Sequence, residues 1–143
     1  MLNRLSKLRE ERTEGDKGFT LIELLVVVVI IGILIAIAIP LYLNYQKGAK
    51  NKAAQSDTRN AVSTVEQCAS DNDNTPPATA DAAGGVNGAD LVFTCGTGTQ
   101  TATVSNGDTL TYANAGGVYT ITGKNKDGGT TYTYVSNVGK VTG

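Results

Sequence analysis

The 143-residue sequence contains no His, no Trp and only two Cys, at positions 68 and 95. Without His it offers no Ser-His-Asp triad and no Cys-His pair, and two Cys alone do not make a zinc site. Lys and Arg nearly balance Asp and Glu, for a net charge of −1. The composition therefore predicts no enzyme, no metal site and no cofactor, and the balanced charge argues against bulk nucleic-acid binding.

The chain does contain a long hydrophobic run near its N-terminus. Residues 1–18 are rich in charges of both signs, and Leu24 to Leu43 then gives twenty consecutive uncharged residues, mostly Leu, Val and Ile. Twenty helical residues span roughly 30 Å, the thickness of a bilayer's hydrocarbon core. The run therefore predicts a membrane-spanning helix, and the small excess of Lys and Arg before it favours a cytoplasmic N-terminus.

Two ordinary interpretations of this run leave one residue unexplained. The run fits a secretory signal peptide cut after Ala36-Ile37-Ala38, and it also fits a plain single-pass anchor. Neither accounts for Glu23, a carboxylate at the edge of the run that needs a partner in an apolar environment. Lys17 lies six residues back, off the same helix face, and no Lys or Arg follows within two turns.

A third interpretation supplies the partner. The segment directly before the apolar run reads Lys17-Gly18-Phe19-Thr20-Leu21-Ile22-Glu23. This segment resembles the processing motif of type IV prepilins and of the related secretion pseudopilins. The resemblance implies that a membrane peptidase cuts after Gly18 and methylates the new amino terminus at Phe19. It also implies that Glu23 neutralises the terminal amine of a neighbouring subunit in a filament.

Two further residues of the run fit this resemblance, which covers residues 17–45. Pro40 falls where pilins carry a helix-bending Pro, and Gly32 sits in the middle of the span. Because Pro removes a backbone donor and Gly is a weak helix former, the pair predicts a kink with local unwinding between them.

A second helical pattern follows the apolar run. Small apolar residues recur every three or four positions, whereas Asp57 and most other charged residues fall elsewhere on the helical wheel. The stripe consists of Ala54, Thr58, Ala61, Val62, Val65, Cys68 and Ala69. The pattern predicts an amphipathic continuation of a helix that runs from Phe19 to about Ser70, where Asn and Pro residues end it.

The rest of the chain is typical of β-structure. Residues 71–90 predict a loop with Gly84-Gly85 and Asn87-Gly88 turns, and short runs rich in Thr, Val, Tyr and Ile follow. The predicted strands are Leu91–Cys95, Thr101–Val104, Thr109–Ala113, Val118–Thr122, Thr131–Val135 and Lys140–Thr142. The alternative is a disordered Thr/Gly/Asn-rich linker, but the alternation of hydrophobic residues favours a sheet.

The predicted fold class is α+β, a long N-terminal helix packed on a C-terminal antiparallel sheet of three to five strands, which is the type IV pilin fold that the resemblance implies. Its segments are a cleaved leader (1–18), a transmembrane and filament-core helix (19–43), an amphipathic helix (44–70), a loop (71–90) and a sheet region (91–143).

The two cysteines predict one disulfide. Cys68 lies on the apolar stripe, Cys95 ends the first predicted strand, and an exported domain faces an oxidising compartment. Two buried free thiols are the alternative. Many relatives place their bridge nearer the carboxy terminus, so the role of this bridge is not copied from the family.

The function implied by the resemblance is structural. The chain would be a pilin, held in membrane lipid as a prepilin and polymerised with copies of itself into a surface filament for motility, adhesion or DNA uptake. A prepilin peptidase and methyltransferase, a platform protein and a motor ATPase are the implied partners. The rivals are a secretion pseudopilin and a membrane-anchored adhesin that binds a surface ligand or DNA weakly through Tyr112, Tyr119, Lys124 and Lys126.

Overall fold

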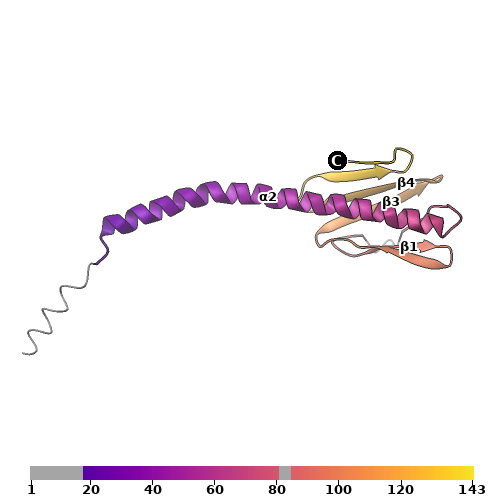
Figure 1. Ribbon diagram of the computed structural model, residues 1–143, viewed down its shortest axis with the longest axis horizontal. Coiled ribbons are helices and arrows are strands. Elements are labelled where there is room, and N and C mark those ends of the chain that lie inside the picture. The colour runs from indigo at the N-terminus through magenta and orange to yellow at the C-terminus, as the bar shows by residue number, and fades with distance from the viewer. Residues whose placement is uncertain (1–17, 81–84) are drawn as a thin grey trace, which may run out of the picture. The chain divides into compact units, whose positions relative to one another are not determined.

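A computed structural model describes residues 18–80 and 85–143. Residues 1–17 of the predicted leader, and Gly84 of the predicted Gly84-Gly85 turn, lie outside the described residues. The described chain forms one long helix, α2, followed by six strands, β1 to β6 (Figure 1). Its contacts divide the chain into two units, the first ending at Leu41 and the second comprising Tyr42–Gly143.

Helix α2 runs from Leu21 to Ser70. It begins two residues later than the predicted start at Phe19, because Thr20 acts as its N-terminal cap. Beyond its end, Asp73 and Asn74 adopt left-handed backbone angles, with φ of 50° and 58°. Asp and Asn tolerate this conformation better than most residues, so the chain reverses here as the sequence predicts.

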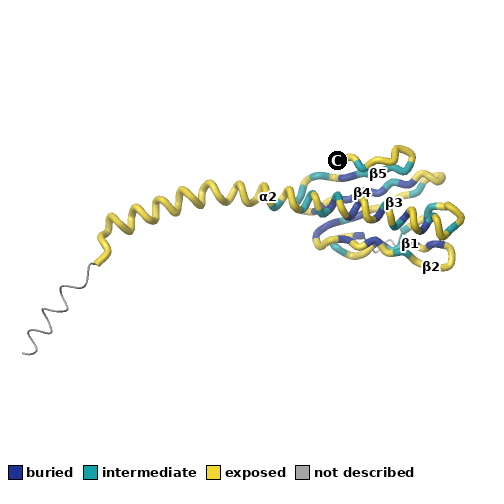
Figure 2. The backbone as a smooth tube through the Cα atoms, in the orientation of Figure 1, coloured by how far each residue is buried: buried dark blue, intermediate teal, exposed yellow. Residues whose placement is uncertain are grey.

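The first unit contains the apolar half of α2. From Phe19 to Leu41, all the large hydrophobic side chains are exposed, from 48% at Val26 to 85% at Phe19, and this part of the tube is yellow in Figure 2. The helix is long and apolar enough to cross a membrane. A helix that is hydrophobic on every side is typically buried in a protein core or a membrane, so we expect apolar surroundings for this half of α2.

The backbone between Gly32 and Pro40 is α-helical throughout. The local unwinding predicted there is therefore absent from the described chain. Pro40 removes a single backbone donor, and the neighbouring hydrogen bonds are enough to keep the helix continuous. A bend at these two residues stays a prediction.

The second unit combines the rest of α2 with two antiparallel sheets. One is a hairpin of β1 and β2, and the other has four strands in the order β3-β4-β5-β6. The strands are β1 (Leu91–Cys95), β2 (Gly98–Ala102), β3 (Asp108–Ala115), β4 (Val118–Asn125), β5 (Thr131–Val135) and β6 (Lys140–Thr142). The α+β prediction of a long helix on a small antiparallel sheet is confirmed, with the strands divided between two sheets instead of one.

The predicted second strand, Thr101–Val104, is displaced from the observed β2. A tight turn at Gly96-Thr97 brings Gly98 opposite Cys95, so the hairpin begins to pair at once. The first residues of β2 are exposed and carry no hydrophobic alternation, which is why the sequence pattern does not reveal them.

The core lies between the stripe of α2 and both sheets. The stripe is buried at Ala54, Thr58, Ala61, Val65 and Cys68. Alternate residues of the strands, which point to one face of each sheet, pack against this stripe. They are dark blue in Figure 2. The largest of these buried side chains are Phe93, Leu110 and Ile121. The helix therefore joins the two sheets into one hydrophobic cluster.

Helix α2 approaches β4 closely at Gly123. A Cβ atom at this position would overlap Thr58 Oγ1 and would lie 2.8 Å from Leu110 Cδ2 and 3.1 Å from the Ala54 carbonyl oxygen. Because backbone and buried side chains surround the site, there is no flexible group that could move aside. The absence of a side chain at Gly123 thus sets the distance between helix and sheet.

The buried side of α2 also contains a charged residue, which the sequence pattern predicted to lie away from the stripe. Asp57 is only 5% exposed. Its Oδ2 accepts a hydrogen bond from the Ser105 backbone N–H at 2.6 Å, and its Oδ1 accepts one from Ser105 Oγ at 3.1 Å. Asp57 is three residues after Ala54 and four before Ala61, so helical geometry puts all three on one side.

The turn after β4 holds α2 at Lys50 and Asn51, near the middle of the helix. Lys50 Nζ donates to Asp127 Oδ2 at 2.6 Å, and the Asn51 side-chain oxygen accepts from the Thr130 backbone N–H at 3.2 Å. The hydrogen bond from Lys50 lowers the pKa of Asp127 below its usual value. These two contacts fix α2 to the turn that connects β4 and β5.

We expect Gly123→Ala to destabilise the second unit by about 1 to 3 kcal/mol, the usual cost of overpacking a core. Thermal unfolding of the full chain in detergent, followed by the tyrosine circular dichroism, measures the effect. Gly98→Ala is the matched control, because Gly98 lies in a strand with ordinary backbone angles and its nearest neighbouring atom, the Cys95 carbonyl oxygen, is 4.0 Å from the added Cβ. Equal melting temperatures for the two variants would contradict the close-packing argument.

Candidate functional site

The residues that precede α2 are open to solvent. Gly18, Phe19 and Thr20 have no regular secondary structure, and all three are exposed. Among the described residues outside its own chain neighbours, no atom lies within 4 Å of a Cβ placed on Gly18. The peptide bond between Gly18 and Phe19 is therefore accessible to another protein, and it lies directly before the helix.

Thr20 and Glu23 form a reciprocal cap at the start of α2. The Glu23 backbone N–H donates to Thr20 Oγ1 at 3.3 Å, and the Thr20 backbone N–H donates to Glu23 Oε2 at 2.9 Å. The Thr20 hydroxyl also donates to the same carboxylate oxygen, at 2.8 Å. This is the capping box, in which a Thr and a Glu three residues apart satisfy free donors at a helix start. The cap sets the boundary of the helix at Thr20.

The Glu23 carboxylate keeps its capacity to bind a cation. Both hydrogen bonds that it accepts come from Thr20 and end on Oε2. Within the described ranges, 18–80 and 85–143, the one ion pair joins Lys50 to Asp127 and does not involve Glu23. The carboxylate is therefore preorganised by its own helix start and is free to meet a positive charge from outside.

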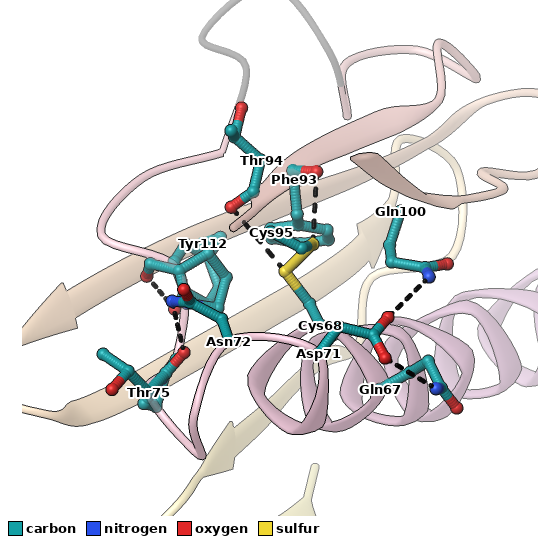
Figure 3. The surroundings of a disulfide bond; sticks show 12 residues. Gln67, Cys68, Asp71, Asn72, Thr75, Phe93, Thr94, Cys95, Gln100 and Tyr112 are labelled. Atoms are coloured by element: carbon teal, nitrogen blue, oxygen red, sulfur yellow. Dashed lines mark hydrogen bonds between the residues drawn. A yellow bond between two sulfur atoms is a disulfide. The ribbon is translucent and has the colours of Figure 1, made fainter. Parts of the chain in front are cut away.

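The second unit carries a covalent link between α2 and the hairpin. Cys68, in the last turn of α2, is bonded to Cys95, the last residue of β1, with 5.0 Å between their Cα atoms (Figure 3). Both side chains lie in the hydrophobic cluster. The half-cystine sulfurs carry no proton, so their short distances to the Phe93 and Thr94 carbonyl oxygens, drawn in Figure 3, are contacts without hydrogen-bond donation.

Polar contacts surround the disulfide on its exposed side. Gln100 Nε2 donates to Asp71 Oδ2 at 3.1 Å and so joins β2 to the residue that follows α2 (Figure 3). Asn72 Nδ2 donates to the Thr75 carbonyl oxygen at 3.2 Å, which closes the turn after the helix. The end of α2 is thus held by one covalent bond and by the turn that reverses the chain.

The tyrosines suggested for an adhesin site belong to the core. Tyr112 and Tyr119 stack with ring centroids 5.9 Å apart, between Phe93 on one side and Tyr134 on the other. Tyr119 is 5% exposed, and burial raises its pKa above the ordinary value. The Tyr112 hydroxyl donates to the Pro77 carbonyl oxygen at 2.6 Å. Both rings are therefore engaged in contacts that hold the sheet and the loop together, whereas Lys124 and Lys126 are exposed.

Comparison with known proteins places the most specific signal in the N-terminal segment. Residues 15–39 match the family model described as the prokaryotic N-terminal methylation motif. The type IV major fimbrial protein FimA of Dichelobacter nodosus is 50% identical over 56 residues, which is 39% of this chain and 36% of that protein. The type IV major pilin protein PilA of Myxococcus xanthus is 50% identical over 44 residues, 31% of this chain and 20% of PilA.

A fimbrial protein of Pseudomonas aeruginosa is 69% identical over 32 residues, or 22% of this chain and 21% of that protein. The aligned parts of the chain thus span about a third or less of each relative. No solved structure gives a significant match. The chain carries the N-terminal methylation motif and is similar to type IV fimbrial proteins, and this similarity covers only part of its length.

We expect the exported protein to contain the Cys68–Cys95 bridge. In the chain-entropy model, a bridge with a sequence separation of 27 residues stabilises the folded state by about 3.5 kcal/mol. Replacing both cysteines by Ser should therefore lower the melting temperature of the full chain in detergent. Because the sequence has no other Cys, no alternative bridge can form within one chain.

Non-reducing peptide mapping of the protein taken from cells tests the bridge directly. The expected product is one cross-linked peptide pair that separates on reduction. Free thiols that react with an alkylating agent at both positions would show that the bridge does not form after export.

Proposed function

We propose that the chain is the subunit of a type IV pilus, made as a prepilin, cut after Gly18 and methylated at Phe19. The observation that carries this proposal is the order of features in one short segment. An accessible Gly18–Phe19 bond, a capped helix start with Glu23, and a helix apolar on every side follow each other directly. The family match to residues 15–39 supports the same processing chemistry.

The apolar half of α2 is suited to two environments, the lipid bilayer before assembly and the core of a filament after it. Before assembly, the run Leu24 to Leu43 is long enough to span a bilayer, and lipid covers its exposed side chains. After assembly, the same side chains are covered by copies of the helix in the core of a filament. A contact between different faces of identical subunits does not close on itself and produces a helical fibre.

In this apolar core, the Glu23 carboxylate would determine where a neighbouring subunit binds. A carboxylate among hydrocarbon or packed helices is costly unless a positive charge meets it. Cleavage after Gly18 would create an amine at Phe19, and the amine of a neighbouring subunit is the cation that the described chain itself does not provide. The pairing would fix the axial position of each new subunit relative to its neighbour.

The remaining partners follow from this pathway. A membrane peptidase and methyltransferase would process the chain, and a platform protein with a motor ATPase would extract it from lipid into the filament. The surface fibre would be extracellular, with the disulfide-linked domain facing outward. These partners belong to the proposal, because the relatives match the chain over only part of their length.

The type IV pilus is preferred to a secretion pseudopilus because the similar proteins are described as fimbrial proteins and a major pilin. A membrane-anchored adhesin built on Tyr119 is disfavoured, since that ring is buried. Loss of a visible surface fibre on deletion of the gene would separate a pilus from a short periplasmic pseudopilus.

The position of cleavage provides the first test of the proposal. We expect mass spectrometry of the filament subunit to find N-methylated Phe19 at the amino terminus. The unprocessed chain isolated from a strain without the peptidase is the control. A mature chain that begins at Ile39 would show instead that the apolar run is a secretory signal peptide, and it would refute the pilin proposal.

The role of the Glu23 charge can be separated from its role as a cap. Glu23→Gln keeps a side-chain oxygen for the Thr20 backbone N–H but removes the charge, whereas Thr20→Val removes the capping hydroxyl but keeps the charge. We expect Glu23→Gln, like Glu23→Ala, to be cleaved normally and to form no fibres, because the terminal amine is left unpaired. Thr20→Val should still form fibres.

Cleavage is measured by the mass of the membrane-bound subunit, and assembly by electron microscopy and quantification of sheared fibres. Fibres in normal number from Glu23→Gln cells would disprove the pairing role. Loss of fibres in Thr20→Val cells alone would assign the requirement to the helix cap.

A further inference from the structure

Two carboxyl groups lie buried together between α2 and the start of β3. Asp57 is 5% exposed and Asp108 is fully buried. Both meet at Ser105, because Ser105 donates to the Asp57 carboxylate and its carbonyl oxygen accepts from the Asp108 backbone N–H at 2.9 Å. Neither residue belongs to the processing motif or to the apolar half of the helix. Adjacent carboxyl groups in a buried site do not both ionise easily, so the pair requires a specific arrangement of charge.

The hydrogen bonds of the pair are asymmetric. Both oxygens of Asp57 accept hydrogen bonds from Ser105, as expected of an ionised carboxylate. Asp108 Oδ1 accepts a hydrogen bond from the Asn125 side-chain amide, but Asp108 Oδ2 is buried and has no hydrogen-bond partner among the described residues. An unpaired oxygen of a charged carboxylate would be costly at this place, whereas a protonated oxygen could donate to the neighbouring carboxylate.

Among the described residues, no ion pair joins a Lys or Arg to these two carboxyl groups. Asn125, from β4, is neutral, and Lys50 is engaged by Asp127. Charged groups on the neighbouring elements include Lys124, which is opposite Thr109 in the sheet, Lys126, whose methylene chain lies beside Gly107, and Asp90, which accepts from the Val104 backbone N–H at 3.1 Å. Burial and the Asp57 carboxylate raise the pKa of Asp108, against the opposing effect of the Asn125 hydrogen bond.

We propose that Asp57 and Asp108 share one proton in the folded domain, with Asp108 as a neutral acid whose Oδ2–H donates to the Asp57 carboxylate. The shared proton joins α2 to the start of β3 in the four-stranded sheet. One proton thereby satisfies the unpaired oxygen and removes the repulsion between the two groups.

The pH dependence follows from the direction of the shift. The folded state binds the proton of Asp108 more tightly than the unfolded state, in which an aspartate has a pKa of about 3.9. This contribution to stability is therefore fully present below that value and is lost as the pH rises through the higher pKa of the folded domain. A rise in pH, and not a fall, therefore weakens the contact between helix and sheet.

The protonation state is measured by NMR on the full chain in detergent micelles, with ¹³C in the aspartate carboxyl groups. We expect the Asp108 carboxyl signal to titrate above the ordinary value for an aspartate, which is about 3.9. A midpoint at or below that ordinary value would mean that both carboxyl groups are ionised together, and it would overturn the proposal.

Thermal unfolding at a series of pH values from about 4 upward, compared between the wild type and Asp108→Asn, provides an independent measurement. We expect the melting temperature of the wild type, relative to that of Asp108→Asn, to fall as the pH rises through the pKa of Asp108 in the folded domain. The amide of the variant donates to Asp57 at every pH, so the variant lacks this titration.

Asp90→Asn is the matched control, because Asp90 is an exposed aspartate that also accepts a backbone hydrogen bond, and this variant should keep the wild-type pH profile. An Asp108→Asn profile with the wild-type slope would overturn the proposal. If Asp108→Asn does not fold, the NMR titration of the wild-type chain decides alone.

Discussion

The close approach of α2 to β4 is the contact on which the second unit depends. Only small side chains fit at this crossing, so the helix offers Ala54, Thr58 and Ala61 where a larger core would use Leu or Ile, and Gly123 offers no side chain at all. Asp57 is also buried in this interface between helix and sheets. The domain therefore needs polar partners for its helix, and it obtains them from the turn at Ser105 and from the start of β3.

The sequence contains most of the fold because its signals are local. The strands β1, β5 and β6 have the predicted bounds, since alternating Val, Phe, Tyr and Thr are punctuated by Gly and Asn. The beginning of β2 escapes prediction because Gly98 and its neighbours pair through their backbones and carry no hydrophobic signal. The division into two sheets depends on contacts between distant residues that no local pattern encodes. Helical spacing alone places Asp57 on the buried side of α2, but the partner that allows its burial, Ser105, is distant in sequence.

In the candidate site, too, the residues that are close in sequence could be predicted, whereas their contacts required the structure. Gly18, Phe19 and Glu23 lie within six residues of one another, so their relation can be recognised from the order of amino acids alone. The Thr20 cap also has a sequence signature, a Thr three residues before a Glu, yet its importance emerges from geometry. Glu23 satisfies its own helix start through one oxygen, and the proposed pairing uses the capacity that remains. A single carboxylate can thus define where the helix begins and what it meets.

The contacts that hold α2 at Lys50 and at Cys68 differ in kind, and in the proposed filament this difference would matter under mechanical load. Tension on a fibre would enter the domain along the chain from the apolar half, and it would first reach Lys50 and Asn51, which are held by an ion pair and a hydrogen bond. The far end of the helix is held by the covalent Cys68–Cys95 bond. Rupture would therefore begin at the weak end and stop at the bridge, so that a stretched subunit could lengthen without losing its connection to the hairpin and could re-form its contacts when the force is released.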